Sequence, residues 1–191
     1  MNSVGYFELY VNGRKVGTDV LSPAVSDTRR HSLYVAYDIG PYLKSGTNCI
    51  GLWCGRGWAT KAEPPGLRVR FQCGLPDKTG KDTVWILSDE SWKMAPSPYT
   101  TLGSQSWGKF GGERYDANLQ NANWCTPDFD DSKWANAKAA PSAPARADAQ
   151  SCPANRIGKI LLAIACTSLG EGRYEMDFGS NLSGQMALKL R

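Results

Sequence analysis

Short apolar segments, each bounded by turn residues, recur along the chain and set its predicted secondary structure. Tyr6–Val11 and residues 67–73 alternate between apolar and polar positions, which predicts strands with one buried face. The continuous apolar run at residues 49–55 is short enough to be a buried strand. Asn12-Gly13 directly follows the first strand, and this pair is the strongest short signal for a hairpin turn. No segment demands a long helix, so the pattern predicts an all-β fold.

Further strands are predicted at residues 33–39 and 83–87, whereas the Gly-, Ser- and Pro-rich residues 96–112 are expected to form a loop. The stretch rich in Ala, Pro and Ser that ends at residue 149 is typical of a linker. We therefore expect a first domain at residues 1–140, a linker at 141–152 and the start of a second domain at 153–191. Strands are predicted in that last part at residues 157–165, 173–179 and 185–190. Three strands are too few for a β-sandwich, so the second domain looks truncated.

Composition and charge exclude several classes of protein. The chain has 191 residues, a formal net charge of +4 and no cluster of Lys and Arg interleaved with aromatic residues, so nucleic-acid binding is not expected. Six scattered cysteines and one histidine lack the spacing of a zinc site. No apolar run reaches the length of about 18 residues that a transmembrane helix needs. The sequence leaves the cellular compartment and any disulfide pairing open.

The segment from Gly112 to Trp134 concentrates acidic, amide and indole side chains in a turn-rich region. Glu113, Asp116 and Asn118 could converge on one calcium ion, because calcium is bound by six to eight oxygen ligands. Tyr115 is expected to point the other way, into the core. Trp58 and Trp107, each beside a glycine in a loop, are the candidates for stacking on a sugar ring. The remaining tryptophans singled out are expected in the core: Trp53, Trp85, Trp124 and Trp134.

These segments, in this order, resemble the N-terminal region of bacterial α-L-rhamnosidases over nearly the whole chain. The residues that carry the resemblance are Glu8 to Gly17; Tyr34 to Asp38; Leu43, Gly46 and Asn48; Gly51 with Gly55-Arg56-Gly57-Trp58; Gly112-Glu113 with Tyr115-Asp116-Ala117; Trp124, Asp130-Asp131 and Trp134; and Asp177 to Gly184. Each motif is weak alone, and the ordered combination is more specific.

The resemblance implies a β-jelly-roll with a galactose-binding-like sandwich, followed by the first strands of a second, incomplete β-sandwich. It also implies that catalysis belongs to an (α/α)6 barrel elsewhere in the parent enzyme, so this segment is not expected to hydrolyse a glycoside. Some members use the jelly-roll as a calcium-dependent L-rhamnose-binding module, and by resemblance its acidic-amide segment falls on Glu113 to Asn118. The family commonly has Arg where this chain has Asn118.

The leading hypothesis is therefore a non-catalytic carbohydrate-binding domain that binds terminal rhamnose in a glycan, with calcium as the candidate cofactor and the parent's catalytic barrel as a partner in cis. A second hypothesis is a structural domain that braces the barrel and has no ligand of its own. The ordinary turn role available to nearly every polar residue named above supports this alternative. A third hypothesis is that the longer parent protein is an enzyme, although this segment of it lacks the catalytic residues. A galactosidase-like sandwich without specificity for rhamnose is the alternative fold.

Overall fold

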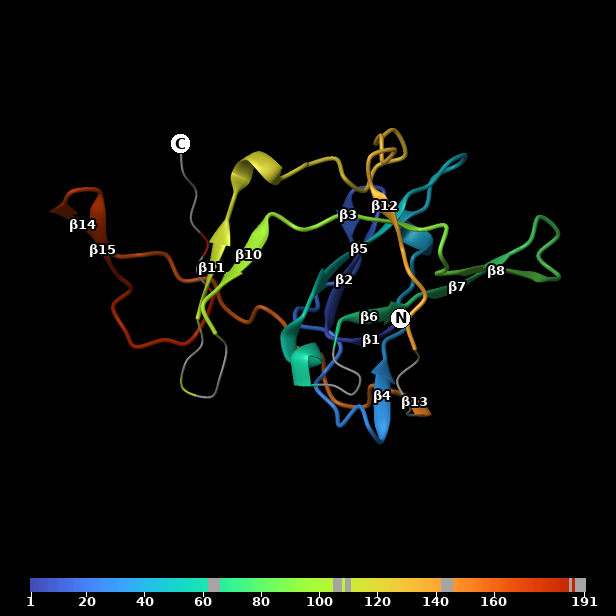
Figure 1. Cartoon of the computed structure of the whole chain (residues 1–191), viewed down its shortest axis with the longest axis horizontal. Coiled ribbons are helices and arrows are strands. Elements are labelled where there is room, and N and C mark those ends of the chain that lie inside the picture. The colour runs from blue at the N-terminus through green and yellow to red at the C-terminus, as the bar shows by residue number, and fades with distance from the viewer. Residues whose placement is uncertain (62–65, 105–107, 109–110, 142–145, 186, 188–191) are drawn as a thin grey trace. The chain divides into compact units, whose positions relative to one another are not determined.

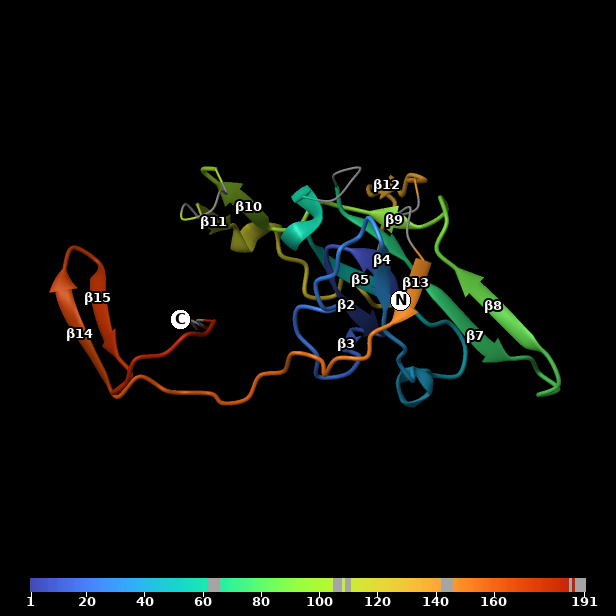
Figure 2. The ribbon, with the colours of Figure 1, turned by 90° about the horizontal axis from the view of Figure 1, so that it is seen from below.

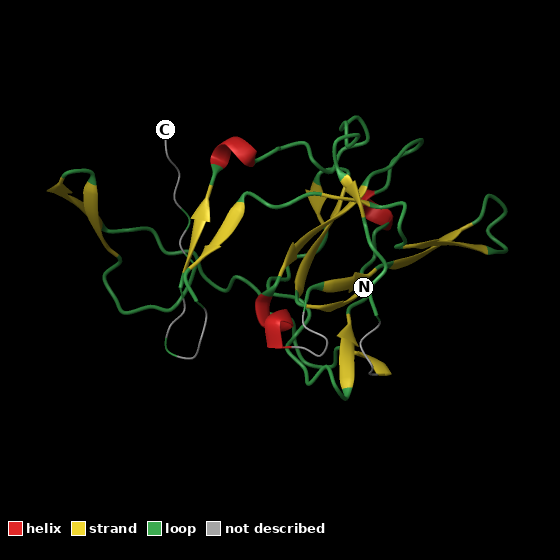
Figure 3. Cartoon of the chain, viewed as in Figure 1, coloured by secondary structure: helices red, strands yellow, loops and turns green. Residues whose placement is uncertain are grey.

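The computed structural model describes residues 1–61, 66–104, 108, 111–141, 146–185 and 187. The chain divides into two units, Met1–Arg156 and Ile157–Arg191. Regular structure in both units is almost entirely β-strand (Figure 3), and the helices among the described residues are short 3-10 turns. The fold class is all-β, as the alternating pattern predicts.

A three-stranded antiparallel sheet forms the centre of the first unit, in the order β3-β2-β5 (Figure 1). Strand β2 spans Tyr6–Val11, β3 spans Arg14–Lys15 and β5 spans Ile50–Gly55. Tyr6 pairs with Gly55 at one end of the β2–β5 ladder, and Val11 pairs with Ile50 at the other. Asn12 and Gly13 connect β2 to β3 with φ of 52° and 78°, the left-handed conformation that a type I′ turn requires. The predicted hairpin is confirmed.

A second sheet has four strands in the order β13-β4-β1-β6. Its strands are β1 (Asn2–Val4), β4 (His31–Tyr34), β6 (Arg68–Arg70) and β13 (Arg146–Ala149). Strand β13 pairs in parallel with β4, with Arg146 opposite His31. β13 falls within residues 141–152, the expected linker, and the division between the two units comes later, after Arg156. The ladder to β4 therefore ties the described part of this stretch to the first unit.

Two-stranded antiparallel pairs complete the first unit. They are β7 with β8 (Gln72–Pro76 and Thr83–Leu87), β9 with β12 (Lys93–Met94 and Ala135–Asn136), and β10 with β11 (Tyr99–Leu102 and Gly112–Tyr115). The turn between β7 and β8 projects away from the two sheets in both views (Figures 1 and 2). The described parts of the connections contain the 3-10 helices η1 (Gly40–Tyr42), η2 (Gly57–Lys61) and η3 (Ala117–Leu119).

Alternating side chains of β2 anchor the hydrophobic core of the first unit. Leu9 and Val11 are buried together with Val16, Ile39 and Phe71. Half-buried side chains of β5, β7 and β8 pack against this cluster, among them Leu52, Leu75 and Ile86. A smaller cluster joins Val4 of β1 to Ala59 of η2 and Leu67. Burial on one face of each strand is what the period of two in the sequence predicts.

The second unit contains one described antiparallel pair, β14 (Ala165–Gly170) with β15 (Arg173–Asp177). Every residue of both strands is exposed, including Leu169, Tyr174 and Met176. An isolated two-stranded hairpin is marginally stable in water, because it has no second layer against which to bury its apolar face.

Several predicted strand positions were wrong. Residues 35–39 leave β4 and run irregularly into η1, where Pro41 occupies the first turn. The segment expected to be a loop at 96–112 contains β10, whose partner β11 lies more than ten residues further along the chain. The strand expected at 157–165 forms instead at Ala165–Gly170. Residues 186 and 188–190, in the last predicted strand, lie outside the described residues.

Asn12 provides a test of the fold, because its buried side chain joins three segments. Its Nδ2 donates to Tyr42 O at 3.0 Å and to Asn48 Oδ1 at 2.8 Å, and its Oδ1 accepts from Cys49 N at 3.0 Å. We expect Asn12→Ala to lower the free energy of unfolding by about 2–4 kcal/mol, because it leaves buried polar groups without partners. Urea denaturation measures this loss.

Asn12→Gly is the matched control, since glycine tolerates the positive φ but removes the same hydrogen bonds. We expect Asn12→Gly to lose most of the stability that Asn12→Ala loses. Full stability in the Gly variant would show that the backbone conformation, and not the hydrogen bonding, is what Asn12 contributes.

Candidate functional site

Two cavities open on the first unit, near opposite ends of β2. The first has a volume of about 330 Å³ and is lined by residues 3–6, residues 23–29 and Trp58. The second has a volume of about 310 Å³, and aromatic side chains dominate its lining. Tyr6 belongs to the first lining and Tyr10 to the second, so one strand contributes to both cavities. We call them the Trp58 cavity and the aromatic cavity.

Local packing explains why Trp58 is directed outward. Gly57 has φ of +44°, and a Cβ built there would lie 2.5 Å from the ring of Tyr6. The backbone can therefore approach Tyr6 only with glycine at this position. Ala59, one residue beyond Trp58, is buried against Val4, and its N–H donates to Arg56 O at 2.8 Å. With η2 held in this way, Trp58 is left 55% exposed at the wall of the cavity.

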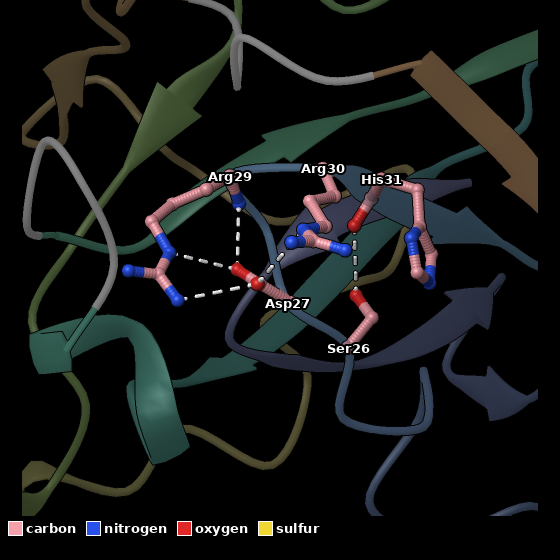
Figure 4. A network of polar contacts seen from close by, with 5 residues as sticks. All are labelled: Ser26, Asp27, Arg29, Arg30 and His31. Carbon is pink, nitrogen blue, oxygen red and sulfur yellow. Dashed lines mark hydrogen bonds and ion pairs between the residues drawn. The ribbon is translucent and has the colours of Figure 1, made fainter.

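A tight turn after Pro23 supplies the charged groups of the Trp58 cavity. Asp27 O accepts from the N–H groups of Arg30 and His31 at 2.9 and 3.0 Å, which closes the turn. Arg29 donates from Nε to Asp27 Oδ1 at 3.0 Å and from Nη2 to Oδ2 at 3.2 Å (Figure 4). Arg30 lies on the other side of the carboxylate, with Nε 3.9 Å from Oδ2.

The electrostatics of this turn favour a permanently ionised carboxylate. Hydrogen bonds from the side chain and then the backbone of Arg29 hold the pKa of Asp27 below its usual range. Asp27 and Arg29 both line the cavity that also contains Trp58. An ionised carboxylate only accepts hydrogen bonds and a guanidinium only donates them, whereas a sugar hydroxyl does both. The arrangement can therefore hold a polyhydroxylated ring against an indole face.

The aromatic cavity differs because its rings pack mainly on one another. The ring centroids of Tyr99 and Tyr115 are 4.9 Å apart, those of Tyr10 and Trp124 are 5.3 Å apart, and those of Trp53 and Trp124 are 5.8 Å apart. Such tilted and edge-to-face contacts stabilise the fold beyond simple burial. Trp58, in contrast, is in none of the ring contacts found among the described residues.

The polar groups of the aromatic cavity are already paired. Glu8 accepts from the Tyr10 hydroxyl at 3.0 Å and forms an ion pair with Lys15. Burial, followed by the charge of Glu8, raises the pKa of Tyr10 to about 12. The hydroxyl of Tyr115 donates to Gln120 Oε1. A ligand would have to compete with these internal contacts, as a ligand in the Trp58 cavity would with the hydrogen bonds between Arg29 and Asp27.

The predicted calcium ligands lie in the chain segment that borders the aromatic cavity. Glu113 is in β11 opposite Thr101, and Asp116 caps η3 by accepting from Asn118 N at 3.0 Å. Asn118 also turns its amide Nδ2 toward Asp116 Oδ1, at 3.0 Å. A calcium ion needs oxygens to converge, and here an amide nitrogen occupies that direction. Within the described ranges, no group of three or more His, Cys, Asp or Glu side chains could hold a metal ion.

The structure separates the residues that the sequence suggested for one site. Trp58 lines the first cavity, whereas Tyr115 and Gln120, from the segment around the predicted calcium ligands, line the second. Trp107 lies outside the described residues. Asp27 and Arg29 are the members of the Trp58 cavity that sequence reasoning missed. Their only signal is an acidic residue two positions before a basic one, which is common in surface turns.

Two expectations of core burial were wrong. Trp85 on β8 is 58% exposed, because its face of the β7–β8 hairpin points away from the core that Ile86 contacts. Its ring packs across Gly74 of the neighbouring strand instead. Tyr115 is 43% exposed and pairs with Tyr99 at the mouth of the aromatic cavity. Trp53, Trp124 and Trp134 are each half-buried among other aromatic rings.

Comparison with known proteins places this architecture in a family. Residues 1–159 match the family described as alpha-L-rhamnosidase N-terminal domain. The chain therefore belongs to the alpha-L-rhamnosidase N-terminal domain family. It is 31% identical to an alpha-L-rhamnosidase of Formosa agariphila, over an alignment 202 positions long with gaps included, and 29% identical to one of Streptomyces avermitilis, over an alignment of 199 positions. These alignments cover 98% of this chain and 20% and 18% of the two relatives.

Solved structures show the same relation. The chain resembles the alpha-L-rhamnosidase of Dictyoglumus thermophilum with a TM-score of 0.83 and 33% identity, over 94% of this chain and 20% of that one. It resembles the Streptomyces avermitilis enzyme, solved in complex with L-rhamnose, with a TM-score of 0.80 and 28% identity. This match covers 94% of this chain and 18% of that one. The chain thus spans about a fifth of the length of these relatives. The jelly-roll-like class of sandwich expected from the sequence is confirmed.

None of the helices among the described residues is long and apolar enough to cross a membrane.

Gly57→Ala tests how Trp58 is positioned. We expect a loss of about 1–3 kcal/mol in the free energy of unfolding, because the new methyl group meets the Tyr6 ring and alanine is strained at positive φ. Urea denaturation, followed by tryptophan fluorescence, measures the loss in the free energy of unfolding. The control is Gly55→Ala, where a Cβ meets no atom within 4 Å and should change stability by less than about 0.5 kcal/mol. Equal losses in both variants would contradict this account of η2.

Proposed function

We propose that the chain is a non-catalytic carbohydrate-binding accessory domain of an alpha-L-rhamnosidase, and that it binds terminal L-rhamnose in the Trp58 cavity. The observation that carries the proposal is the exposed indole of Trp58 in one cavity with the ionised Asp27 and the guanidinium of Arg29. Membership of the family and the relatives' descriptions as alpha-L-rhamnosidases supply the class of sugar.

The chemistry of the sugar suits this cavity. L-rhamnose is a 6-deoxy sugar, so its methyl group and ring C–H bonds give it an apolar face that can pack against an indole. Its hydroxyl groups can donate to Asp27 and accept from Arg29. A volume of about 330 Å³ is at the low end of the range for small-molecule sites, which favours one sugar unit over a long chain.

The same cavity is poorly suited to hydrolysis. Inverting glycosidases place two carboxyl groups on either side of the scissile bond, about 6.5–9.5 Å apart. Asp27 is the one carboxylate among the described residues that line the Trp58 cavity. We therefore assign this segment a role in binding and place the parent's catalytic groups in the part of the relatives that this chain does not span.

Calcium binding is a separate part of the proposal and concerns Glu113, Asp116 and Asn118. Calcium would have to replace the two hydrogen bonds that Asp116 receives from Asn118. The expected result is weak calcium binding that leaves the Trp58 cavity unchanged.

A structural role is the second candidate. Exposed apolar side chains on β14 and β15, and on the outer face of the β7–β8 hairpin, favour contact with further protein surface. Because the relatives are about five times longer than this chain, the partner in this proposal is the catalytic part of the parent enzyme in cis.

Calorimetric titration with L-rhamnose separates the two candidates. We expect heat of binding from the unaltered chain and at least a tenfold loss of affinity in Trp58→Ala, which corresponds to about 1.4 kcal/mol. Trp85→Ala is the matched control, since Trp85 is as exposed as Trp58 but lines neither cavity. Each titration is repeated with calcium and with EDTA.

The outcomes are distinct. Loss of binding in Tyr115→Ala but not in Trp58→Ala would transfer the site to the aromatic cavity. Binding that disappears with EDTA would make calcium part of the site. The absence of heat in both buffers, from protein whose circular dichroism shows folded β-structure, would favour the structural role.

A further inference from the structure

A pair of cysteines beneath the aromatic cavity has no role in carbohydrate binding as proposed above. Cys125 is 1% exposed, and its Sγ lies 3.7 Å from Tyr10 O and 3.9 Å from Cys49 O. Cys49 immediately precedes β5 and is half-buried. The two cysteines are separated by 76 positions in the sequence but adjoin in the fold.

The thiols themselves interact. Burial, followed by the charge of the neighbouring Cys125 and a hydrogen bond with it, raises the pKa of Cys49 to about 12. Cys54, within β5, has its pKa raised to about 11 by burial alone. The position of Cys125 Sγ, 3.9 Å from Cys49 O, places Cys125 directly beside Cys49. Both cysteines are free thiols in this structure.

The backbone around the pair is held in place, so a cross-link has to form at the spacing that the fold already gives the two cysteines. Asn12 donates from its backbone N–H to Cys49 O at 2.9 Å and accepts from Cys49 N at Oδ1. On the other side, Trp124 N donates to Asn121 O and Thr126 N donates to Asn123 O, so Cys125 lies within a hydrogen-bonded turn. Disulfides form between cysteines whose Cα atoms are about 4.4–6.8 Å apart, and they strain or fail where the backbone must move to reach that distance.

We propose that Cys49 and Cys125 are a disulfide site, which a small-molecule disulfide oxidises to a cross-link between the start of β5 and the turn that carries Trp124. This inference does not depend on sugar binding in the Trp58 cavity. A metal site is a poorer interpretation, because within the described part of the chain no third acidic, histidine or cysteine ligand completes a group around the pair.

The chemistry balances with glutathione disulfide as the oxidant. The thiolate of the more accessible Cys49 attacks one sulfur of glutathione disulfide and releases a glutathione thiolate. The thiolate of Cys125 then attacks Cys49 Sγ, which forms the internal disulfide and releases the second glutathione thiolate. Two electrons pass from the cysteine pair to the oxidant, and the two protons lost by the cysteines go to the two released thiolates or to buffer.

The cross-link would stabilise the wall of the aromatic cavity. Trp124 packs on Tyr10 and Trp53, and a Cβ on Gly51 would meet both Trp124 and Cys125 at less than 3 Å. The turn therefore already packs closely on β5. A disulfide that closes a long loop reduces the entropy of the unfolded chain most, so oxidation is expected to raise the thermal stability of the first unit.

The experiment is oxidation of the folded, full chain by glutathione disulfide, followed by alkylation of remaining thiols and peptide mass mapping. We expect a linked peptide that contains Cys49 and Cys125 and disappears on reduction with dithiothreitol. The oxidised chain should melt about 5–10 °C higher than the reduced chain. Oxidation should accelerate by about tenfold for each unit of pH above about 7.5, because the thiolate is the attacking species.

Cys49→Ser is the test variant, because Cys49 is less buried than Cys125 and its replacement should still fold. We expect this variant to lose both the linked peptide and the rise in melting temperature. Cys54→Ser, in the strand β5 that Cys49 precedes, is the matched control and should retain both. A folded chain in which only the exposed Cys152 and Cys166 carry glutathione, or in which Cys49 links to another cysteine, would overturn the proposal.

Discussion

The buried amide of Asn12 is the constraint on which the arrangement of the first unit depends. It closes the turn after β2 and binds the backbone at Tyr42 and Cys49, so the β2–β5 ladder starts in a single register. A shift of one residue would turn Leu9 and Val11 from the core to the opposite face of the sheet. Both cavities then follow from β2, since Tyr6 borders one and Tyr10 the other.

Local signals explain which strands the sequence predicted well. The β2–β3 hairpin follows from an alternating strand and an Asn-Gly turn, and β15 follows from the alternation at residues 173–179. Strand β10 has no comparable signal, because its strand character comes from pairing with β11 across a long connection. The predicted burial of Trp85 was wrong for a different reason. Its neighbours are apolar on both faces of the hairpin, so composition alone cannot say which face meets the core.

In the candidate site, too, some residues could be predicted from local sequence, whereas others depend on tertiary packing. Trp58 could be singled out from sequence because Gly57 beside it marks a turn, and the structure places it at a cavity wall. Asp27 could not be singled out, because it lines the same cavity as Trp58 only through the packing of Pro23 and its neighbours beside β1 and β2. The segment from Glu113 to Asn118 has the oxygen-rich composition of a calcium site. Its described hydrogen bonds nevertheless serve to cap η3, which composition does not reveal.

Sugar recognition at Trp58 is the central claim, and two-dimensional NMR of the ¹⁵N-labelled chain during addition of L-rhamnose tests it most directly. We expect the shifted signals to be the Trp58 indole N–H and the backbone amides of Gly57 and of residues 27–29. The signals of Tyr99, Tyr115 and Gln120 should stay in place. Shifts confined to these last residues, or no shifts at saturating sugar, would contradict the claim.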